Sequence, residues 1–313
     1  NYDGNDIFLK KGNRCLTIND FPHLASLKGR TLILTDGTTL LGADNKAGIA
    51  EILTACEKVT QRSIPHGKIC IAFTPDEEIG KGTDFFDRNL FTAEFAYTVD
   101  GGQEGEINFE NFNACEAVFQ IQGVNVHPGS AKNIMLNASL AAFEINNMLP
   151  SADTPRNTEG YEGFFHLTKM EGTVESARLE YIVRDHSQEN FAMRKKMLQH
   201  IEKVMNEKYG DGTVQLSIKE QYANMAALIE PHQHLIDSAV KAMETVGFKP
   251  ILVPIRGGTD GARLTYQGLP CPNLCTGGYA FHGPFEHITA ESLENCAEMI
   301  VEIIKIYSEK TIL

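Results

Sequence analysis

Short apolar runs alternate with helical stretches over the first third of the chain. TLILTDG, KICIAFTPDEE and FAYTVDGG each hold a nearly continuous apolar run that ends in polar or acidic residues. Between the first two, AGIAEILTACEKV places Ile49, Leu53 and Val59 at helical spacing. Near-continuous apolar strands separated by helices are typical of a parallel sheet that is covered on both faces. This part of the chain therefore predicts an α/β domain.

The pattern changes between about residues 114 and 222. ARLEYIVRD and VQLSIK alternate apolar with polar residues, which is typical of an antiparallel sheet with one wet face. Two helical patterns accompany them, one through Leu136, Leu140 and Phe143, and the other through the following four residues: Phe191, Leu198, Ile201 and Met205. The order strand, helix, strand, strand, helix, strand predicts a ferredoxin-like α+β fold.

The α/β pattern returns after residue 222. A helical pattern runs from Leu235 to Met243, ILVPI follows, and a final amphipathic helix runs from Leu293 to Tyr307. We therefore expect one α/β domain, made of residues 1–112 and 223–313, that is interrupted by an inserted α+β domain over residues 113–222. An insertion of this kind predicts a cleft at the junction, where small-molecule sites tend to lie.

Composition narrows the class of protein. A length of 313 residues suggests about two domains, and the net charge of −13 argues against nucleic acid or an anionic membrane as the partner. No apolar stretch approaches the ~18 residues of a membrane span, and the polar start NYDGNDIFLKKGNR does not resemble a signal peptide. Seven scattered cysteines without a zinc-knot spacing indicate reduced thiols, so we expect a cytoplasmic protein.

Three acidic motifs follow predicted strands. Asp44 stands between an apolar run and a helix, Asp76, Glu77 and Glu78 follow CIAFTP, and Asp100 follows FAYTV. Each has a simpler explanation alone: a helix N-cap, a solvated first turn, or the start of a turn. Open α/β sheets place their sites at the carboxyl ends of the strands, so the three motifs should converge. Carboxylates gathered in one place repel each other and favour a bound cation.

Histidine would complete such a cation site. His282 lies in TGGYAFHGPFEH after two glycines, and His287, five residues on, is the alternative. His232 and His234 have a metal-like spacing in PHQH, but they open a helix remote from the acidic motifs, so we do not expect them to bind metal.

Six spaced motifs, which span nearly the whole chain, carry a specific resemblance. They are GADNKAG, TPDEEIGKG, YTVDGG, VHPGSAK, RGGTDGA and TGGYAFHG. In this order they resemble the cocatalytic-zinc peptidase family that includes carnosinase, acetylornithine deacetylase and glutamate carboxypeptidase. TEGYEGFFHL is similar to the tripeptide aminopeptidases within that family. The resemblance implies a zinc-peptidase-like catalytic domain with a mostly parallel sheet, interrupted by a ferredoxin-like lid or dimerisation domain.

The resemblance also implies roles for the acidic motifs. Asp44 resembles the carboxylate that bridges two zinc ions, Glu78 and His282 resemble further ligands of one zinc, and Asp100 resembles a ligand of the other. Glu77 matches the catalytic base, which takes a proton from the zinc-bound water as that water attacks the peptide carbonyl.

Three more residues match substrate-binding positions of the family. His127 resembles a histidine that stabilises the developing oxyanion, in related dimers at a neighbouring active site. Arg256 resembles the group that grips the terminal carboxylate of the substrate, and Asn137 resembles a group that hydrogen-bonds the substrate backbone. The simpler alternatives are a turn histidine, a surface arginine and a helix-start asparagine. The implied substrate is a tripeptide, and a homodimer through the inserted domain is expected from the family.

One family motif is absent. The family carries a His-x-Asp zinc motif well before the bridging aspartate, whereas the 43 residues before Asp44 hold a single histidine, His23, which matches a different family loop. We expect that the chain lacks the N-terminal segment of the family, either as a shortened peptidase, which we favour, or as a product that has lost activity. The functional alternatives are a dipeptidase or N-acyl amino acid deacylase of the same family, or an inactive fragment whose inserted domain serves only in dimerisation.

Overall fold

The structure, a computed structural model, describes residues 1–310, and its internal contacts divide the chain into two units. Unit 1 comprises Asn1–Phe109, Met225–Val253 and the chain from Thr259 onward, and unit 2 comprises Glu110–Asn224 and Pro254–Gly258. Unit 2 begins at residue 110 against an expected 113 and ends its long segment at 224 against 222. Pro254–Gly258, expected with the α/β part, groups with unit 2.

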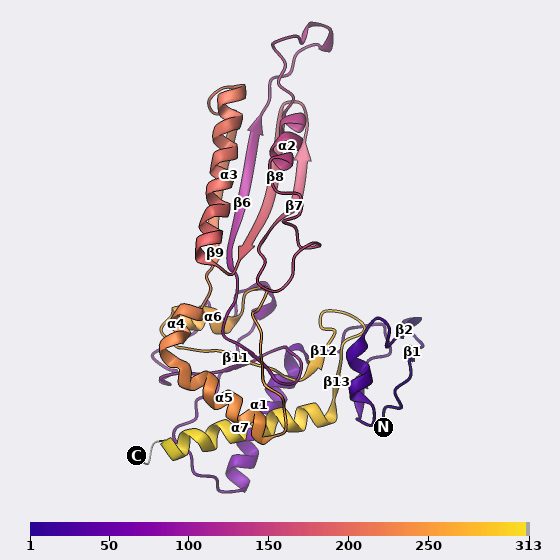
Figure 1. Cartoon of the computed structure of the whole chain (residues 1–313), viewed down its shortest axis with the longest axis vertical. Coiled ribbons are helices and arrows are strands. Elements are labelled where there is room, and N and C mark those ends of the chain that lie inside the picture. Colours follow the sequence, from indigo (N-terminus) through magenta and orange to yellow (C-terminus); the bar gives the residue numbers. More distant parts are fainter. Residues whose placement is uncertain (311–313) are drawn as a thin grey trace. The chain divides into compact units, whose positions relative to one another are not determined.

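Unit 2 is a four-stranded antiparallel sheet with two helices. Its strands β6 (Asn113–Gln122), β7 (Phe164–Gly172), β8 (Ser176–Asp185) and β9 (Val214–Tyr222) have the spatial order β7-β8-β6-β9. Helix α2 (Ala138–Asn147) follows β6 and helix α3 (Gln188–Tyr209) follows β8, and both run along the sheet (Figure 1). The ferredoxin-like prediction is confirmed.

The core of unit 2 lies between the helices and one face of the sheet. Alternate residues such as Phe119 on β6 and Leu179 on β8 are fully buried there, and the four residues predicted for α3 are all buried. The prediction for the earlier helix is wrong in detail, because Leu140 is 65% exposed and Phe143 55% exposed. Helix α2 instead buries its small face, formed by Ala138, Ala141, Ala142 and Ile145, and alanines allow a helix to approach a sheet closely.

Unit 1 contains short strands in two main sheets. The first has the order β10-β5-β11-β4, with two parallel pairs, β10–β5 and β11–β4, and one antiparallel pair, β11–β5. These strands are Ile251–Leu252, Glu106–Asn108, Asn273–Leu274 and Thr98–Val99. The second sheet is antiparallel, in the order β12 (Gly278–Tyr279), β13 (His287–Thr289) and β3 (Leu32–Leu34). A hairpin of β1 (Ile7–Leu9) and β2 (Arg14–Leu16) precedes them.

Helices provide most of the packing in unit 1. The long ones are α1 (Ala43–Gln61), α5 (Gln233–Thr245) and α7 (Ala290–Lys310), and α7 contacts both of the others (Figure 1). Shorter ones are α4 (Ala226–Ile229), α6 (Asp260–Tyr266) and the 3-10 turns η1 (Pro22–Leu27), η2 (Glu77–Ile79) and η4 (Glu230–His232). All three long helices were predicted from their apolar spacing, but for α1 the predicted positions Ile49 and Leu53 are 40% and 52% exposed. No helix within residues 1–310 is long and apolar enough to cross a membrane.

Two strand predictions in unit 1 need correction. TLILTDG forms β3, which pairs antiparallel with β13 and does not join the parallel pairs. KICIAFT is not a strand, since residues 68–74 carry no strand assignment, and within the described chain their backbone makes no hydrogen bond to another backbone group. Its apolar side chains line a cavity, with Ile71 43% and Phe73 49% exposed, and among residues 1–310 no strand pairs with the segment.

Candidate active site

The acidic motifs meet within unit 1. Asp44 lies at the start of α1 with a non-helical backbone (φ −84°, ψ 101°), and its peptide bond to Asn45 is cis. Glu77 and Glu78 form η2, which is entered through Asp76 in the left-handed region (φ 64°). Asp100 directly follows β4. All three motifs were predicted to follow strands, and this is correct for Asp100 alone, since Asp44 lies at a helix start and Glu77 follows the segment 68–74, which is not a strand.

His282 joins this cluster. Its Nε2 lies 2.9 Å from Oδ2 of Asp44 and 3.5 Å from Oε2 of Glu78. One potential ligand atom from each of these three residues lies within 4.8 Å of the others. The hydrogen bond to Asp44 raises the pKa of His282. A histidine nitrogen and two carboxylate oxygens thus converge on one point.

The carboxylates are crowded. Burial, and then the charge of Asp44, raises the pKa of Asp100 to about 8. Burial, followed by the charges of Asp260 and Glu78, raises the pKa of Glu77 to about 7. Burial is the larger cause of both pKa shifts, and the neighbouring negative charges, whose repulsion a bound cation relieves, add to it.

The donor set fits a divalent metal ion. One imidazole nitrogen with carboxylate oxygens is a ligand set that Zn²⁺ accepts, and Asp44, Glu78 and His282 are the group of three or more potential ligands found among residues 1–310. Asp100 adds a carboxylate beside Asp44, so these two aspartates could share a second ion. Glu77 adjoins Glu78 in the chain and lies outside the group.

The other histidines have different partners. His287, the alternative to His282, is fully buried in β13, and its Nε2 lies 2.9 Å from Nε2 of His23. His234 places Nδ1 2.8 Å from the hydroxyl of Tyr307. Neither belongs to the acidic cluster, which leaves His282 as the histidine that the cluster contains.

Sequence reasoning did not identify Glu286. This residue is 1% exposed, and its Oε2 accepts a hydrogen bond from the amide of Gly42 at 2.6 Å while Oε1 accepts one from the amide of Asp44 at 3.0 Å. It therefore holds the backbone that carries Asp44. The one signal in the sequence is an acidic residue between Phe285 and His287, which gives no indication of a partner more than 240 positions away.

The cluster opens into a cavity of about 870 Å³ within unit 1. Its lining includes five acidic residues: Asp44, Glu77, Glu78, Asp100 and Asp260. The remaining wall is largely apolar and includes Ile69, Ile71, Phe73, Ile49 and Ile304. A polar reaction centre beside an apolar wall is the usual composition of a small-molecule site.

The three predicted substrate-binding residues lie in unit 2. His127 is exposed, and its Nδ1 accepts a hydrogen bond from the amide of Gly129 at 3.1 Å, as a turn histidine does. Asn137 is the N-cap of α2, accepting from the amide of Leu140 at 3.2 Å. The guanidinium of Arg256 already has protein partners, as described next.

Arg256 donates four hydrogen bonds inside unit 2. Nη1 reaches the carbonyl oxygens of Gly160 (2.7 Å) and Glu162 (2.9 Å), and Nη2 reaches the carbonyl (3.3 Å) and hydroxyl (3.0 Å) oxygens of Thr158. Its guanidinium also stacks 5.1 Å from the ring centre of Phe112. The Arg256 side chain therefore links two segments of unit 2, residues 254–258 and residues 158–162.

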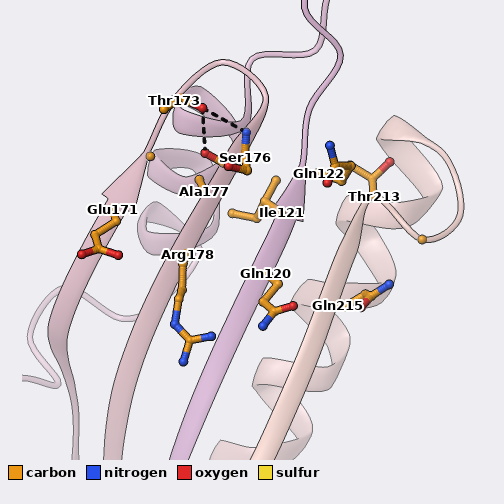
Figure 2. Close-up of a pocket in the computed structure, with 12 residues that line it drawn as sticks. Gln120, Ile121, Gln122, Glu171, Thr173, Ser176, Ala177, Arg178, Thr213 and Gln215 are labelled. Atoms are coloured by element: carbon orange, nitrogen blue, oxygen red, sulfur yellow. Dashed lines mark hydrogen bonds between the residues drawn. The ribbon is translucent and has the colours of Figure 1, made fainter.

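A second cavity of about 390 Å³ lies at one end of the sheet in unit 2. Figure 2 shows Gln120, Arg178 and Gln215 on its strands, with Thr173 hydrogen-bonded to Ser176 in the connecting turn. Its lining contains none of the candidate site residues.

An α/β unit that gathers carboxylates and a histidine at the ends of its elements, with a further glutamate beside them, defines a metal-dependent hydrolase. Residues 42–306 match the family model described as Peptidase family M20/M25/M40. The chain belongs to this family and is a peptidase.

Individual relatives are more specific. The chain is 52% identical over 312 residues to Peptidase T of Caldanaerobacter subterraneus subsp. tengcongensis, and 54% identical over 312 residues to Peptidase T of Halothermothrix orenii. Each match covers 99% of this chain and 76% of the relative.

Solved structures agree on the fold. The aminopeptidase PepT of Bacillus cereus is 26% identical with a TM-score of 0.77, over 88% of this chain and 74% of that one. A dinuclear metal-binding peptidase of the M20 family from Bacillus subtilis is 17% identical with a TM-score of 0.63, over 84% of this chain and 72% of that one, and supports the fold alone.

Proposed function

We propose that this protein is a metal-dependent aminopeptidase that removes the N-terminal residue from tripeptides. The observation that carries the proposal is the convergence of Asp44, Glu78 and His282 beside Glu77, in a chain that is 52–54% identical to proteins named Peptidase T. A dipeptidase or an N-acyl amino acid deacylase would use the same metal site, so the substrate rests on these relatives.

Glu77 is the proposed general base. A divalent ion held by the cluster would lower the pKa of a bound water towards ~7 and polarise the peptide carbonyl. Glu77 would accept a proton from the attacking water and return it to the departing amine. Its neighbour Glu78 would hold metal, since adjacent residues in a tight turn direct their side chains differently.

We propose two zinc ions per subunit. Asp44 would bridge them, Glu78 and His282 would complete the donors to one, and Asp100 would bind the other. The adjacency of the Asp44 and Asp100 carboxyl groups supports a shared pair of ions, because two such groups repel each other when both are charged.

Unit 2 is the proposed lid or dimerisation domain, inserted into a catalytic domain formed by unit 1. Its His127 would stabilise the oxyanion, Asn137 would contact the substrate backbone, and Arg256 would bind the terminal carboxylate of a tripeptide. Arg256 retains Nε as a donor that the protein contacts given above do not use.

All seven cysteines are free, which supports a reducing, cytoplasmic setting.

The test is a substrate panel with the zinc-loaded protein. Free tripeptides, dipeptides, N-acetylated tripeptides and N-acetyl amino acids would be compared by kcat/KM. We expect free tripeptides to be cleaved at the first peptide bond and acetylated ones to be resistant. Equal cleavage of free and acetylated tripeptides would reject an aminopeptidase, and faster hydrolysis of dipeptides or N-acetyl amino acids would identify one of the alternatives.

A further inference from the structure

Asp260, the first residue of α6, is a buried carboxylate that the proposed mechanism does not use. It is 5% exposed, and it lies outside the group of potential metal ligands. Its Oδ2 accepts a hydrogen bond from the hydroxyl of Thr74 at 2.8 Å. Thr74 comes immediately before residues 75–81, the loop that contains Glu77 and Glu78. This contact therefore holds the entrance to the loop.

The same carboxylate contacts the exit of the loop. A Cβ placed on Gly82 would lie 2.1 Å from Oδ2 of Asp260, a separation that real atoms do not adopt. Only glycine allows the backbone to approach the carboxylate this closely. One side chain therefore touches the loop on both sides of Glu77 and Glu78.

Arg263 supports the same loop one turn later on α6. Its Nη1 lies 3.3 Å from Oδ1 of Asp84, and its Nη2 is close to Gly80, where an added Cβ would lie 3.4 Å away. Residues three apart on a helix share a face, so Asp260 and Arg263 present one surface to the loop.

The start of α6 is itself firmly anchored. A Cβ on Gly261 would lie 2.5 Å from the carbonyl oxygen of Cys271 and 3.1 Å from Oγ1 of Thr98. Thr98 begins β4, the strand that leads to Asp100. The first turn of α6 thus connects the loop of Glu77 with the strand that delivers Asp100.

We propose that Asp260 is a positioning residue that fixes the loop bearing Glu77 and Glu78 by binding Thr74 at its entrance and packing on Gly82 at its exit. The catalytic meaning of this loop rests on the proposed function, whereas the holding of the loop does not. Asp260 acts through the backbone of the loop and need not touch the substrate or an ion.

Hydrogen exchange of the metal-free protein tests the holding of the loop directly. In Thr74→Val, which keeps the side-chain shape but loses the hydroxyl, and in Asp260→Ala, the amides of Gly80 and Lys81, which donate to the carbonyl oxygens of Glu77 and Asp76, should exchange about fivefold faster, the factor that one ordinary hydrogen bond contributes. Thr74→Ser restores the hydroxyl and should restore protection. Asp185→Ala is the matched control, because Asp185 is a buried carboxylate (2% exposed) in unit 2 that packs on Gly163 in the same way.

Kinetics of the zinc-loaded variants test the consequence. Thr74→Val and Asp260→Ala should lower kcat about 10- to 100-fold, because small displacements of catalytic groups have effects of this size, with KM for a tripeptide changed less than threefold. Unchanged exchange at Gly80 and Lys81, or faster exchange spread evenly over unit 1, would overturn the proposal, as would failure of Thr74→Ser to recover. If the parent protein cleaves no peptide, the proposed function fails, while the exchange result still decides whether Asp260 holds the loop.

Discussion

Glu286 accepts a hydrogen bond from the backbone amide of Asp44 at 3.0 Å, although the two residues lie 242 positions apart. Its second oxygen accepts from the amide of Gly42, so both acceptors of a buried carboxylate are used to shape the turn that precedes α1. Groups that orient metal ligands in this way tune affinity without touching the ion.

Replacement of Glu286 by Gln should lower metal affinity about tenfold or more, because a glutamine amide offers one acceptor oxygen where two backbone amides need one each. Zinc titration with a competing chelator measures this. Glu291→Gln is the matched control, since Glu291 also accepts from a backbone amide, that of Thr31, but at the surface and away from the cluster. Equal zinc affinity in Glu286→Gln and the parent protein would contradict the assignment.

Glu77→Gln should lower kcat about 10²- to 10⁴-fold while bound zinc stays nearly constant, because the change removes the proposed base and spares the proposed ligands. Asp44→Ala should lose both the activity and the metal. Atomic absorption after gel filtration gives the metal content, and a tripeptide assay gives kcat. Asp76→Asn, on the same turn, should retain both. An active Glu77→Gln protein would show that another group is the base.

The elements that could be predicted from the sequence are those in which buried residues repeat at the spacing of a helix or a strand. Helix α3 and strand β8 bury the positions that their patterns mark, since period 3.6 and period 2 report which face meets the core. The segment at residues 68–74 has the same apolar character, yet it is not a strand, because a strand also needs a hydrogen-bonded neighbour, which is not a property of the segment itself. The prediction that placed Leu140 and Phe143 on the apolar face of helix α2 failed for a related reason. This helix has two apolar faces, and the one with the smaller side chains packs on the sheet.

The candidate site, like the fold, was predicted only in part. Three acidic motifs were expected to converge at the carboxyl ends of strands, and the structure brings Asp44, Glu78 and His282 within reach of one ion although neither Asp44 nor Glu78 follows a strand. Spacing alone left His282 and His287 as alternatives, and tertiary packing separates them, because His287 points into the core toward His23. Glu286 and Asp260 were not foreseen, since their partners are remote in sequence and a single acid carries no pattern.

The apolar wall of the large cavity should bind a hydrophobic dye. Phe73 is 49% exposed and lines the cavity together with Ile69 and Ile71, so anilinonaphthalene sulfonate should fluoresce with the native protein, and Phe73→Ser should weaken that signal. Phe85 is 99% exposed and lies outside the cavity lining, so Phe85→Ser should leave dye fluorescence unchanged. Equal dye binding in all three proteins would show that the wall does not form a binding surface.

Arg256→Lys should destabilise the protein by about 1 kcal/mol in urea unfolding, because an ammonium group cannot reproduce the four hydrogen bonds to the 158–162 segment, although water can donate to the exposed carbonyl oxygens of Gly160 and Glu162. Arg178→Lys, whose parent side chain pairs with Glu180 at 2.8 Å, is the control and should change stability little. A rise in KM for tripeptides without any loss of stability would assign Arg256 to substrate binding alone.

The contact between His23 and His287 predicts a loss of stability in acid. Burial, and then the charge of His287, lowers the pKa of His23 from 6.5 to about 4, and burial also lowers the pKa of His287. Nδ1 of His287 lies 2.7 Å from the carbonyl oxygen of Phe285, so this nitrogen donates and Nε2 is left to accept from His23. Protonating either ring places a second donor or a charge where a neutral acceptor is needed.

The direction of this pH dependence follows from proton binding. Between pH 6.5 and about 4 the unfolded chain binds more protons at these positions than the folded one, so the stability they contribute is complete above pH 6.5, declines as the pH falls, and for His23 is lost by about pH 4. His23→Gln cannot be protonated and should flatten the pH dependence of the free energy of unfolding over this range, while His66→Gln, at an exposed position, should leave it unchanged. Urea unfolding at pH 7.5, 6, 5 and 4.5 measures the slope. An unaltered slope in His23→Gln would exclude the pair as its source.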